Sequence, residues 1–81
     1  MKEFQNKVAV VTGAGSGIGA ALARACGERG MRVVVVDVEE QAAEQVAQAV
    51  RDGGSEAFAS AVDVGSRSEI DRLADQVEQR F

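Results

Sequence analysis

Two short, uninterrupted apolar runs constrain the fold of this chain more than any other feature. They cover residues 7–12 and 32–37, and Val is the most frequent residue in both. Runs of this length without polar residues at alternate positions predict strands that are buried on both faces. Strands of that kind belong to a parallel sheet with helices packed on its faces, so the chain is expected to fold as an α/β protein.

Helical spacing of apolar residues follows each run. After the first run, the sequence predicts a helix that begins at Gly17, stops at Gly30 and buries a stripe formed by Ile18, Leu22, Ala25 and Cys26. After the second run, it predicts a helix that begins near Glu39, is ended by Gly53 and Gly54, and buries Ala43, Val46, Ala47 and Val50. Each apolar run is therefore joined to a helix by a connection of a few residues.

A third strand is expected at residues 56–62, with a third helix after it. Ser66 and Glu69 are spaced as a capping box, in which the Ser hydroxyl and the Glu carboxylate each bond the other residue's free backbone N–H. The helix then runs to the last residue and carries an apolar stripe of Ile70, Leu73, Val77 and Phe81.

Short connections between alternating strands and helices predict a parallel sheet, because each crossover helix returns the chain to the same end of the sheet. Right-handed crossovers place the first two helices on one face and give the strand order 3-2-1. The sequence contains no Pro and no polar linker. We therefore expect residues 1–81 to form a single domain with the element order βαβαβα.

Charge and composition exclude several classes of function. The net charge is −4 and Lys and Arg do not cluster, so the chain has no electrostatic footprint for nucleic acid or anionic lipid. No apolar run approaches the roughly 20 residues that span a bilayer. A single cysteine and the lack of a leader pattern favour the cytoplasm. With no His and one Cys, no metal site is expected.

The chemistry of the chain is concentrated in the turn between the first run and the first helix, which reads Gly13-Ala14-Gly15-Ser16-Gly17-Ile18-Gly19. A phosphate that binds the backbone amides at a helix N-terminus needs a turn without obstructing Cβ atoms. Gly13 is expected to allow the tight exit from the strand, Gly17 the close approach of a pyrophosphate, and Gly19 the close contact of helix and sheet. Ser16 adds a hydroxyl donor. We expect the free amides of this turn to receive the diphosphate.

The context of the glycine-rich turn favours a dinucleotide site over a plain connection. The residues from Gly15 to Ala20 also fit the general pattern G-x-G-x-x-G/A. A strand is expected before the turn, a helix after it, and an acid at the end of the next strand. A turn without a ligand is the alternative. A Walker-type phosphate loop is excluded because no Gly-Lys-Ser/Thr follows.

Asp37, at the end of the second apolar run, has two interpretations. It could cap the helix that starts near Glu39, since Asp is a preferred N-cap residue. Its position also places it beside an adenosine ribose, where a carboxylate accepts hydrogen bonds from the ribose hydroxyls. A 2'-phosphate there would be repelled, and neither Ser16 nor Val38 supplies a compensating cation. NAD is therefore favoured over NADP. The role of Asp63 is open in the same way, because an acidic side chain in a turn often does no more than accept hydrogen bonds from the backbone.

Taken together, these residues resemble the sequence pattern of a known protein family. The pattern Thr12-Gly13-x-x-x-Gly17-Ile18-Gly19, followed by Asp37 and by Asp63-Val64, resembles the N-terminal part of the short-chain dehydrogenase/reductase family from about Lys7 to the last residue. The resemblance implies a Rossmann-type three-layer fold with NAD as cofactor and NADP as the less favoured one. In that family the glycine turn binds the pyrophosphate, the acid matching Asp37 selects NAD, and the pair matching Asp63 and Val64 contacts the adenine.

The same resemblance implies hydride transfer between a nicotinamide and an alcohol or carbonyl. The family uses a Tyr as acid/base with a Lys four residues on, together with a Ser and an Asn. This chain has no Tyr, and its only lysines are Lys2 and Lys7, so no catalytic residue is assigned. The chain is expected to be a truncated part of such an oxidoreductase that contains the NAD-binding half.

Two other functions stay open from the sequence: a free-standing nucleotide-binding module without catalysis, and a remnant that binds no ligand. The first strand is also expected to lie at the centre of a complete sheet. Without its second neighbour, Val8 to Val11 would form an open apolar edge. The isolated chain is therefore expected to aggregate or to pair edge to edge as a homo-oligomer.

Overall fold

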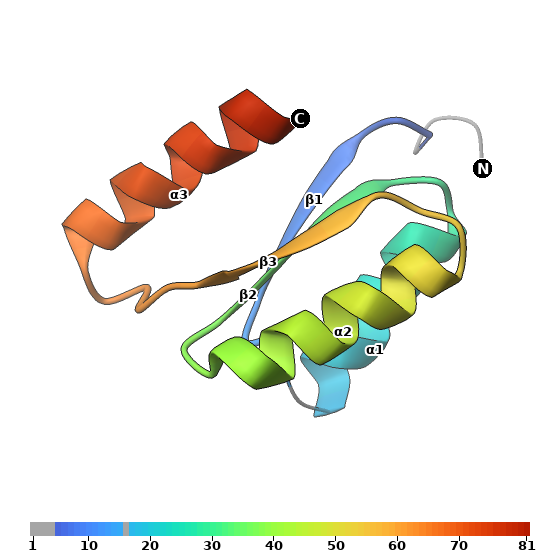
Figure 1. Ribbon diagram of the computed structural model, residues 1–81, viewed down its shortest axis with the longest axis horizontal. Helices are drawn as coiled ribbons and strands as arrows, with labels where there is room; N and C mark the ends of the chain where they lie inside the picture. The colour runs from blue at the N-terminus through green and yellow to red at the C-terminus, as the bar shows by residue number, and fades with distance from the viewer. Residues whose placement is uncertain (1–4, 16) are drawn as a thin grey trace.

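The fold is a three-stranded parallel sheet between two layers of helices (Figure 1). The computed structural model describes residues 5–15 and 17–81. Its strands are β1 (Val8–Thr12), β2 (Arg32–Asp37) and β3 (Ala57–Ala61). β2 lies between β1 and β3 and runs parallel to both, which is the expected 3-2-1 order. The predicted α/β Rossmann-type fold is confirmed. The first strand was predicted one residue too long at its start, and the third strand one residue too long at each end.

The central strand β2 contributes buried side chains to the apolar clusters on both faces of the sheet. Its four valines, Val33 to Val36, are fully buried. Val33 and Val35 belong to one apolar cluster and Val34 and Val36 to the other, as alternation along a strand requires. Full burial of a Val side chain stabilises a fold by about 1.5–3 kcal/mol. The uninterrupted Val run therefore fixes β2 as the strand that is covered on both faces.

The helices divide between the two faces of the sheet. The first cluster contains buried residues of α1 (Gly17–Glu28) and α2 (Glu40–Asp52), and the second contains Leu73 of α3 (Arg67–Arg80). Figure 1 shows α1 and α2 on one side of the strands and α3 on the other. The first two helices share a face, as right-handed crossovers predict.

The predicted apolar stripe of α1 is wrong. Ile18 is 89% exposed and Leu22 is 53% exposed, and Ala25 is also exposed. Cys26 is half-buried and packs against the first apolar cluster. The buried face consists instead of Ala20, Ala23 and Gly27. These small residues let α1 lie close to its neighbours: a Cβ on Gly27 would come within 2.8 Å of a Val50 methyl group on α2. Close helix packing, which small side chains permit, therefore decides which face of α1 is buried, and the larger apolar side chains do not.

β1 is the less covered edge of the sheet. It has β2 as its one neighbour among the described strands. Val8 and Val10 are 37% and 47% exposed, and their partners in register on β2 are Arg32 and Val34. Val34 faces α3, so Val8 and Val10 lie on the same face of the sheet as α3, on the edge strand.

Candidate functional site

The carboxyl ends of the three strands surround one cavity of about 330 Å³. In parallel α/β sheets this end is where ligands bind. The lining comes from the last residues of the strands and the turns after them: Thr12, Gly13, Val36, Asp37, Val38, Val62 and Val64. Three residues that were singled out in separate parts of the sequence, Gly13, Asp37 and Val64, are thus brought together.

The glycine-rich turn has the backbone that its residues predict. Gly13 and Gly17 have φ values of 63° and 45°, in the left-handed region that favours glycine. A Cβ on Gly19 would lie 2.3 Å from the carbonyl oxygen of Gly13, so the close contact expected at Gly19 is present. At Gly17 a Cβ would meet nothing within 4 Å. The turn therefore packs tightly at Gly19 and leaves open space beside Gly17.

The amides of the turn are only partly free. The N–H of Ala14 donates to the carbonyl of Val36 at 3.1 Å, and the N–H of Gly15 donates to Oδ2 of Asp37 at 2.9 Å. The expectation of free amides is wrong at these two positions, because the turn closes on the end of β2. Ser16, another expected donor, lies outside the described residues.

Free amides remain at the first turn of α1. The first N–H groups of any helix have no partner within the helix. Among the hydrogen bonds between residues 5–15 and 17–81, none uses the amides of Gly17, Ile18 or Gly19 as a donor to a residue outside the helix. Ile18 itself is 89% exposed and lies outside the cavity lining. Among the described residues, the first turn of α1 therefore offers backbone donors without a partner, a feature typical of anion sites.

Asp37 joins the two turns that follow β1 and β2. Its Oδ2 accepts the N–H of Gly15, and its Oδ1 accepts the N–H of Glu39 at 3.0 Å. The N-cap of α2 is Glu39, so the interpretation of Asp37 as the N-cap of this helix is wrong. Each carboxylate oxygen has two acceptor sites, and each of these two bonds uses one. Asp37 is thus held in place and retains capacity to accept further hydrogen bonds.

The same bonds favour the ionised form of Asp37. The amide of Glu39, then that of Gly15, lowers the pKa of the Asp37 carboxyl below its ordinary value, and the amide of Val38 lowers it slightly more. Partial burial acts in the opposite direction and is outweighed. The described residues that line the cavity include no Lys or Arg. The wall at Asp37 is therefore negatively charged at neutral pH.

Gly15 has a structural reason that the sequence did not reveal. A Cβ at this position would lie 2.8 Å from Oδ2 of Asp37 and 2.8 Å from Cβ of Ala42 on α2. The missing side chain makes room for the Asp37 carboxylate. Val38, which is 64% exposed, and Val62 line the cavity and were not predicted to do so. Their position directly beside a strand-end acid was the only available signal.

The turn between β3 and α3 is held by a network around Asp63. Its Oδ1 accepts the N–H of Gly65 at 2.8 Å, its carbonyl accepts the N–H of Ser66 at 2.9 Å, and its own N–H donates to Oε1 of Glu69 at 3.1 Å. Asp63 is exposed and does not line the cavity, whereas Val64 does. The side chain of Asp63 therefore has the turn-stabilising role that was one of its two interpretations.

The predicted capping box is half correct. The hydroxyl of Ser66 accepts the N–H of Glu69 at 3.4 Å, as expected. The carboxylate of Glu69 does not bond the N–H of Ser66, because the carbonyl of Asp63 already accepts it. Glu69 reaches further back, to the N–H of Asp63. The start of α3 is thereby bonded to Asp63, the second residue after the end of β3.

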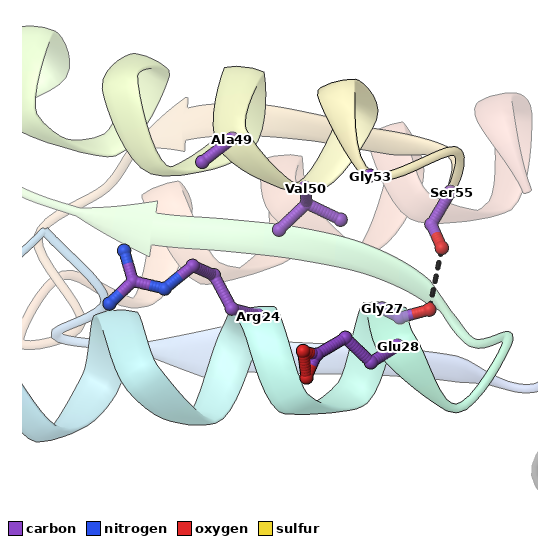
Figure 2. A pocket seen from close by; sticks show the side chains of 7 residues that line it. All are labelled: Arg24, Gly27, Glu28, Ala49, Val50, Gly53 and Ser55. Atoms are coloured by element: carbon purple, nitrogen blue, oxygen red, sulfur yellow. Dashed lines mark hydrogen bonds between the residues drawn. The ribbon is translucent and has the colours of Figure 1, made fainter.

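A second pocket lies at the opposite end of the sheet, between the C-terminal ends of α1 and α2 (Figure 2). Its volume is about 120 Å³. The hydroxyl of Ser55 donates to the carbonyl of Gly27 at 2.6 Å. Figure 2 shows this bond beside the side chain of Val50. This pocket is a gap in helix packing and is remote from the strand ends that carry the predicted site residues.

Comparison with known proteins identifies the family. The family model for short chain dehydrogenases matches residues 7–81. Over 79 residues the chain is 46% identical to a versicolorin reductase of Emericella nidulans. The matched region covers 96% of this chain and 30% of that protein. The chain therefore belongs to the short chain dehydrogenase family, and it spans about 30% of the length of this relative.

Solved structures of the family share the fold. A short chain dehydrogenase/reductase from Burkholderia phymatum, in complex with NAD, superposes with a TM-score of 0.93 at 40% identity and covers all of this chain and 29% of its own. A metagenomic short-chain oxidoreductase in complex with NADP gives a TM-score of 0.85 at 37% identity, over 91% of this chain and 34% of its own.

Two features are absent from residues 5–15 and 17–81. No helix in this part of the chain is long and apolar enough to cross a membrane. No group of three or more His, Cys, Asp or Glu side chains there is placed to hold a metal ion.

Proposed function

We propose that residues 1–81 are the N-terminal part of a dinucleotide-binding Rossmann domain, and that they hold the adenosine and pyrophosphate parts of NAD. The observation that carries this proposal is the position of Asp37. Its ionised carboxylate is fixed by two backbone amides at the wall of the cavity, beside the glycine-rich turn. A fixed acceptor at this place is suited to the hydroxyls of a ribose.

The lining of the cavity fits an adenosine. Asp37 supplies the polar acceptor for the ribose, and the rest of the wall is mostly apolar: Val36, Val38, Val62 and Val64. A flat aromatic base binds well between apolar side chains that a few polar groups orient. In this proposal Asp63 acts through the turn that carries Val64, since its side chain bonds Gly65.

The start of α1 fits the pyrophosphate. The amides of Gly17, Ile18 and Gly19 point out of the helix N-terminus, where the helix dipole favours an anion. The space beside Gly17 would be narrowed by any Cβ, and the left-handed backbone there disfavours other residues. Gly13, Gly15 and Ser16 complete the proposed turn, with Gly15 acting by making room for Asp37.

The charge at Asp37 favours NAD over NADP. A phosphate on the 2'-hydroxyl would lie beside an ionised carboxylate, and like charges repel. No cation lines the described part of the cavity to offset the repulsion. The related solved structures contain NAD in one case and NADP in another, so the preference rests on Asp37 itself.

For the whole protein we propose a cytoplasmic oxidoreductase that transfers a hydride between NAD and an alcohol or carbonyl. When bound, the nicotinamide supplies the hydride chemistry. The residues of this chain bind and orient the distant half of the cofactor. They include no Tyr to act as the family's acid/base, so we assign none of the catalytic steps to them.

The proposal is tested by calorimetric titration of the purified protein with NAD, AMP and NADP. The wild type should bind NAD and AMP saturably and NADP more weakly. Asp37→Asn should weaken NAD about 10- to 100-fold, because hydrogen bonds to a charged acceptor are lost. Asp75→Asn, at an exposed position on α3, is the control and should bind like the wild type. Flat titrations of the wild type would refute the proposal.

A further inference from the structure

We infer that Glu69 is a positioning residue for the apolar cavity wall at Val64, which is proposed to contact the adenine. Its carboxylate accepts the N–H of Asp63, the residue directly before Val64, which lines the cavity. Glu69 lies on α3 and is not among the residues that line the cavity. It therefore acts on the site through the backbone. This inference rests on the proposed nucleotide site and adds a residue to it.

The geometry explains why this bond matters for Val64. Val64 is 54% exposed and lies in a turn that leaves β3 and enters α3. The two residues after Val64 fix the turn by bonding back to the residue before it. The N–H of Gly65 donates to the side chain of Asp63, and the N–H of Ser66 donates to the carbonyl of Asp63. Both of these bonds end on Asp63. Glu69 in turn holds Asp63 through its N–H, so two bonds tie this network to the start of α3, one from Ser66 and one to Glu69.

The distance between Asp63 and Glu69 requires a long side chain. Glu69 is the third residue of α3, and its carboxylate accepts the amide of a residue six positions earlier. An Asp at the same position is one methylene shorter and falls short of that amide. A Gln has the same length and keeps an oxygen that accepts the bond. The effect of the length of the Glu69 side chain can therefore be separated from the effect of its charge by two conservative substitutions.

Other contacts hold α3 on the sheet independently of Glu69. Leu73 is buried in the second apolar cluster, and the ring of Phe81 lies 5.2 Å from that of Phe58. The hydroxyl of Ser60 on β3 bonds the side chain of Gln76 at 2.8 Å. The ion pair of Glu69 with Arg72 is long, at 3.8 Å, and partly exposed to solvent, so its loss has a small effect. Substitution of Glu69 should accordingly leave the fold intact and disturb the turn.

The test compares Glu69→Asp with Glu69→Gln by titration with AMP and NAD. Glu69→Asp should weaken both ligands about three- to tenfold, the range expected when one hydrogen bond is lost, and Glu69→Gln should stay within about twofold of the wild type. Glu78→Asp, at an exposed position of the same helix, is the matched control and should bind like the wild type. Thermal unfolding of each variant checks that all of them are folded.

The possible outcomes separate the two proposals. If Glu69 acted only through its charge at the helix N-terminus, the pattern would reverse: Glu69→Gln would bind poorly and Glu69→Asp normally. That reversal, or wild-type affinity in both variants, overturns the inference and leaves the proposed function standing. If the wild type itself binds neither AMP nor NAD, the proposed function fails, and the role of Glu69 fails with it.

Discussion

The carboxylate of Asp37 and the amide of Gly15 lie 2.9 Å apart, although 22 positions separate the two residues in the chain. The bond connects the end of β2 to the turn that follows β1. Because the amide of Glu39 holds the other carboxylate oxygen, the acceptor is already oriented before any ligand arrives. Groups that are ordered by folding need not be ordered again on binding, which favours affinity.

The stability of the protein should depend on pH through Asp37. Two amides, of Glu39 first and Gly15 second, hold the pKa of this carboxyl below its ordinary 3.8, so the unfolded chain takes up the proton more readily than the folded one. The stabilisation is complete above the unfolded pKa and is lost as the pH falls through the lower folded pKa. The gap in unfolding free energy between wild type and Asp37→Asn should narrow between about pH 7 and pH 2.5 in urea titrations. A gap that stays constant would contradict this assignment.

Gly19→Ala should destabilise the fold. The new Cβ would meet the backbone carbonyl of Gly13 at 2.3 Å, and backbone atoms there have little freedom to move. Overpacking of this kind costs about 1–3 kcal/mol, measurable by chemical denaturation. Gly53→Ala is the matched control, because Gly53 has a φ of −79° and its nearest neighbour would lie at an ordinary 3.4 Å. Equal losses in the two variants would show that the contact at Gly19 is not close.

The strands could be predicted because each is marked by a local pattern. An apolar run bounded by Gly or Asn indicates a buried strand without knowledge of its neighbours, and β2 matches residues 32–37 to the residue. The buried face of α1 could not be predicted in this way. Helical spacing singled out the larger apolar residues, but the face of α1 that is buried consists of Ala20, Ala23 and Gly27, and at Gly27 even a Cβ would come within 2.8 Å of Val50 on α2. Which face is buried depends on a partner that the local sequence does not specify.

The candidate site was predicted in its parts but not in its connections. The residue types of Gly13, Gly17, Gly19 and Asp37 carry their own physical reasons, so they could be chosen from the sequence. The bond from Gly15 to Asp37 joins distant positions, and no spacing rule indicates it. Glu69 was assigned to a capping box, and its actual partner became evident only from the path of the turn.

Cofactor preference should change when the charge at the end of β2 is reversed. Asp37→Ser combined with Val38→Arg removes the repulsion and adds a cation at a position that is 64% exposed and lines the cavity. The ratio of NADP to NAD affinity should rise about 10- to 100-fold, the effect of a charge-assisted pair with phosphate. Ile70→Arg, on α3, controls for added positive charge alone. An unchanged ratio would show that the 2'-position lies away from Asp37.

The isolated 81-residue chain should associate with itself through β1. Its exposed Val8 and Val10 lie on an edge strand, and such edges pair with other chains unless charged residues block them. Val10→Lys should shift sedimentation toward the monomer. Ile70→Lys introduces the same charge at a similarly exposed site, 42% against 47%, and should have no such effect. A wild type that is monomeric at all concentrations would contradict the prediction.

The most direct test is a titration of the isotopically labelled protein with NAD, followed by the chemical shifts of its backbone amides. The account predicts saturable shifts at Gly17, Ile18 and Gly19, where the diphosphate binds, together with shifts at Asp37 and Val64. Asp37→Asn should keep the same pattern at a higher NAD concentration. Saturable shifts confined to other regions, or no shifts at the start of α1, would contradict the claim that this turn receives the diphosphate.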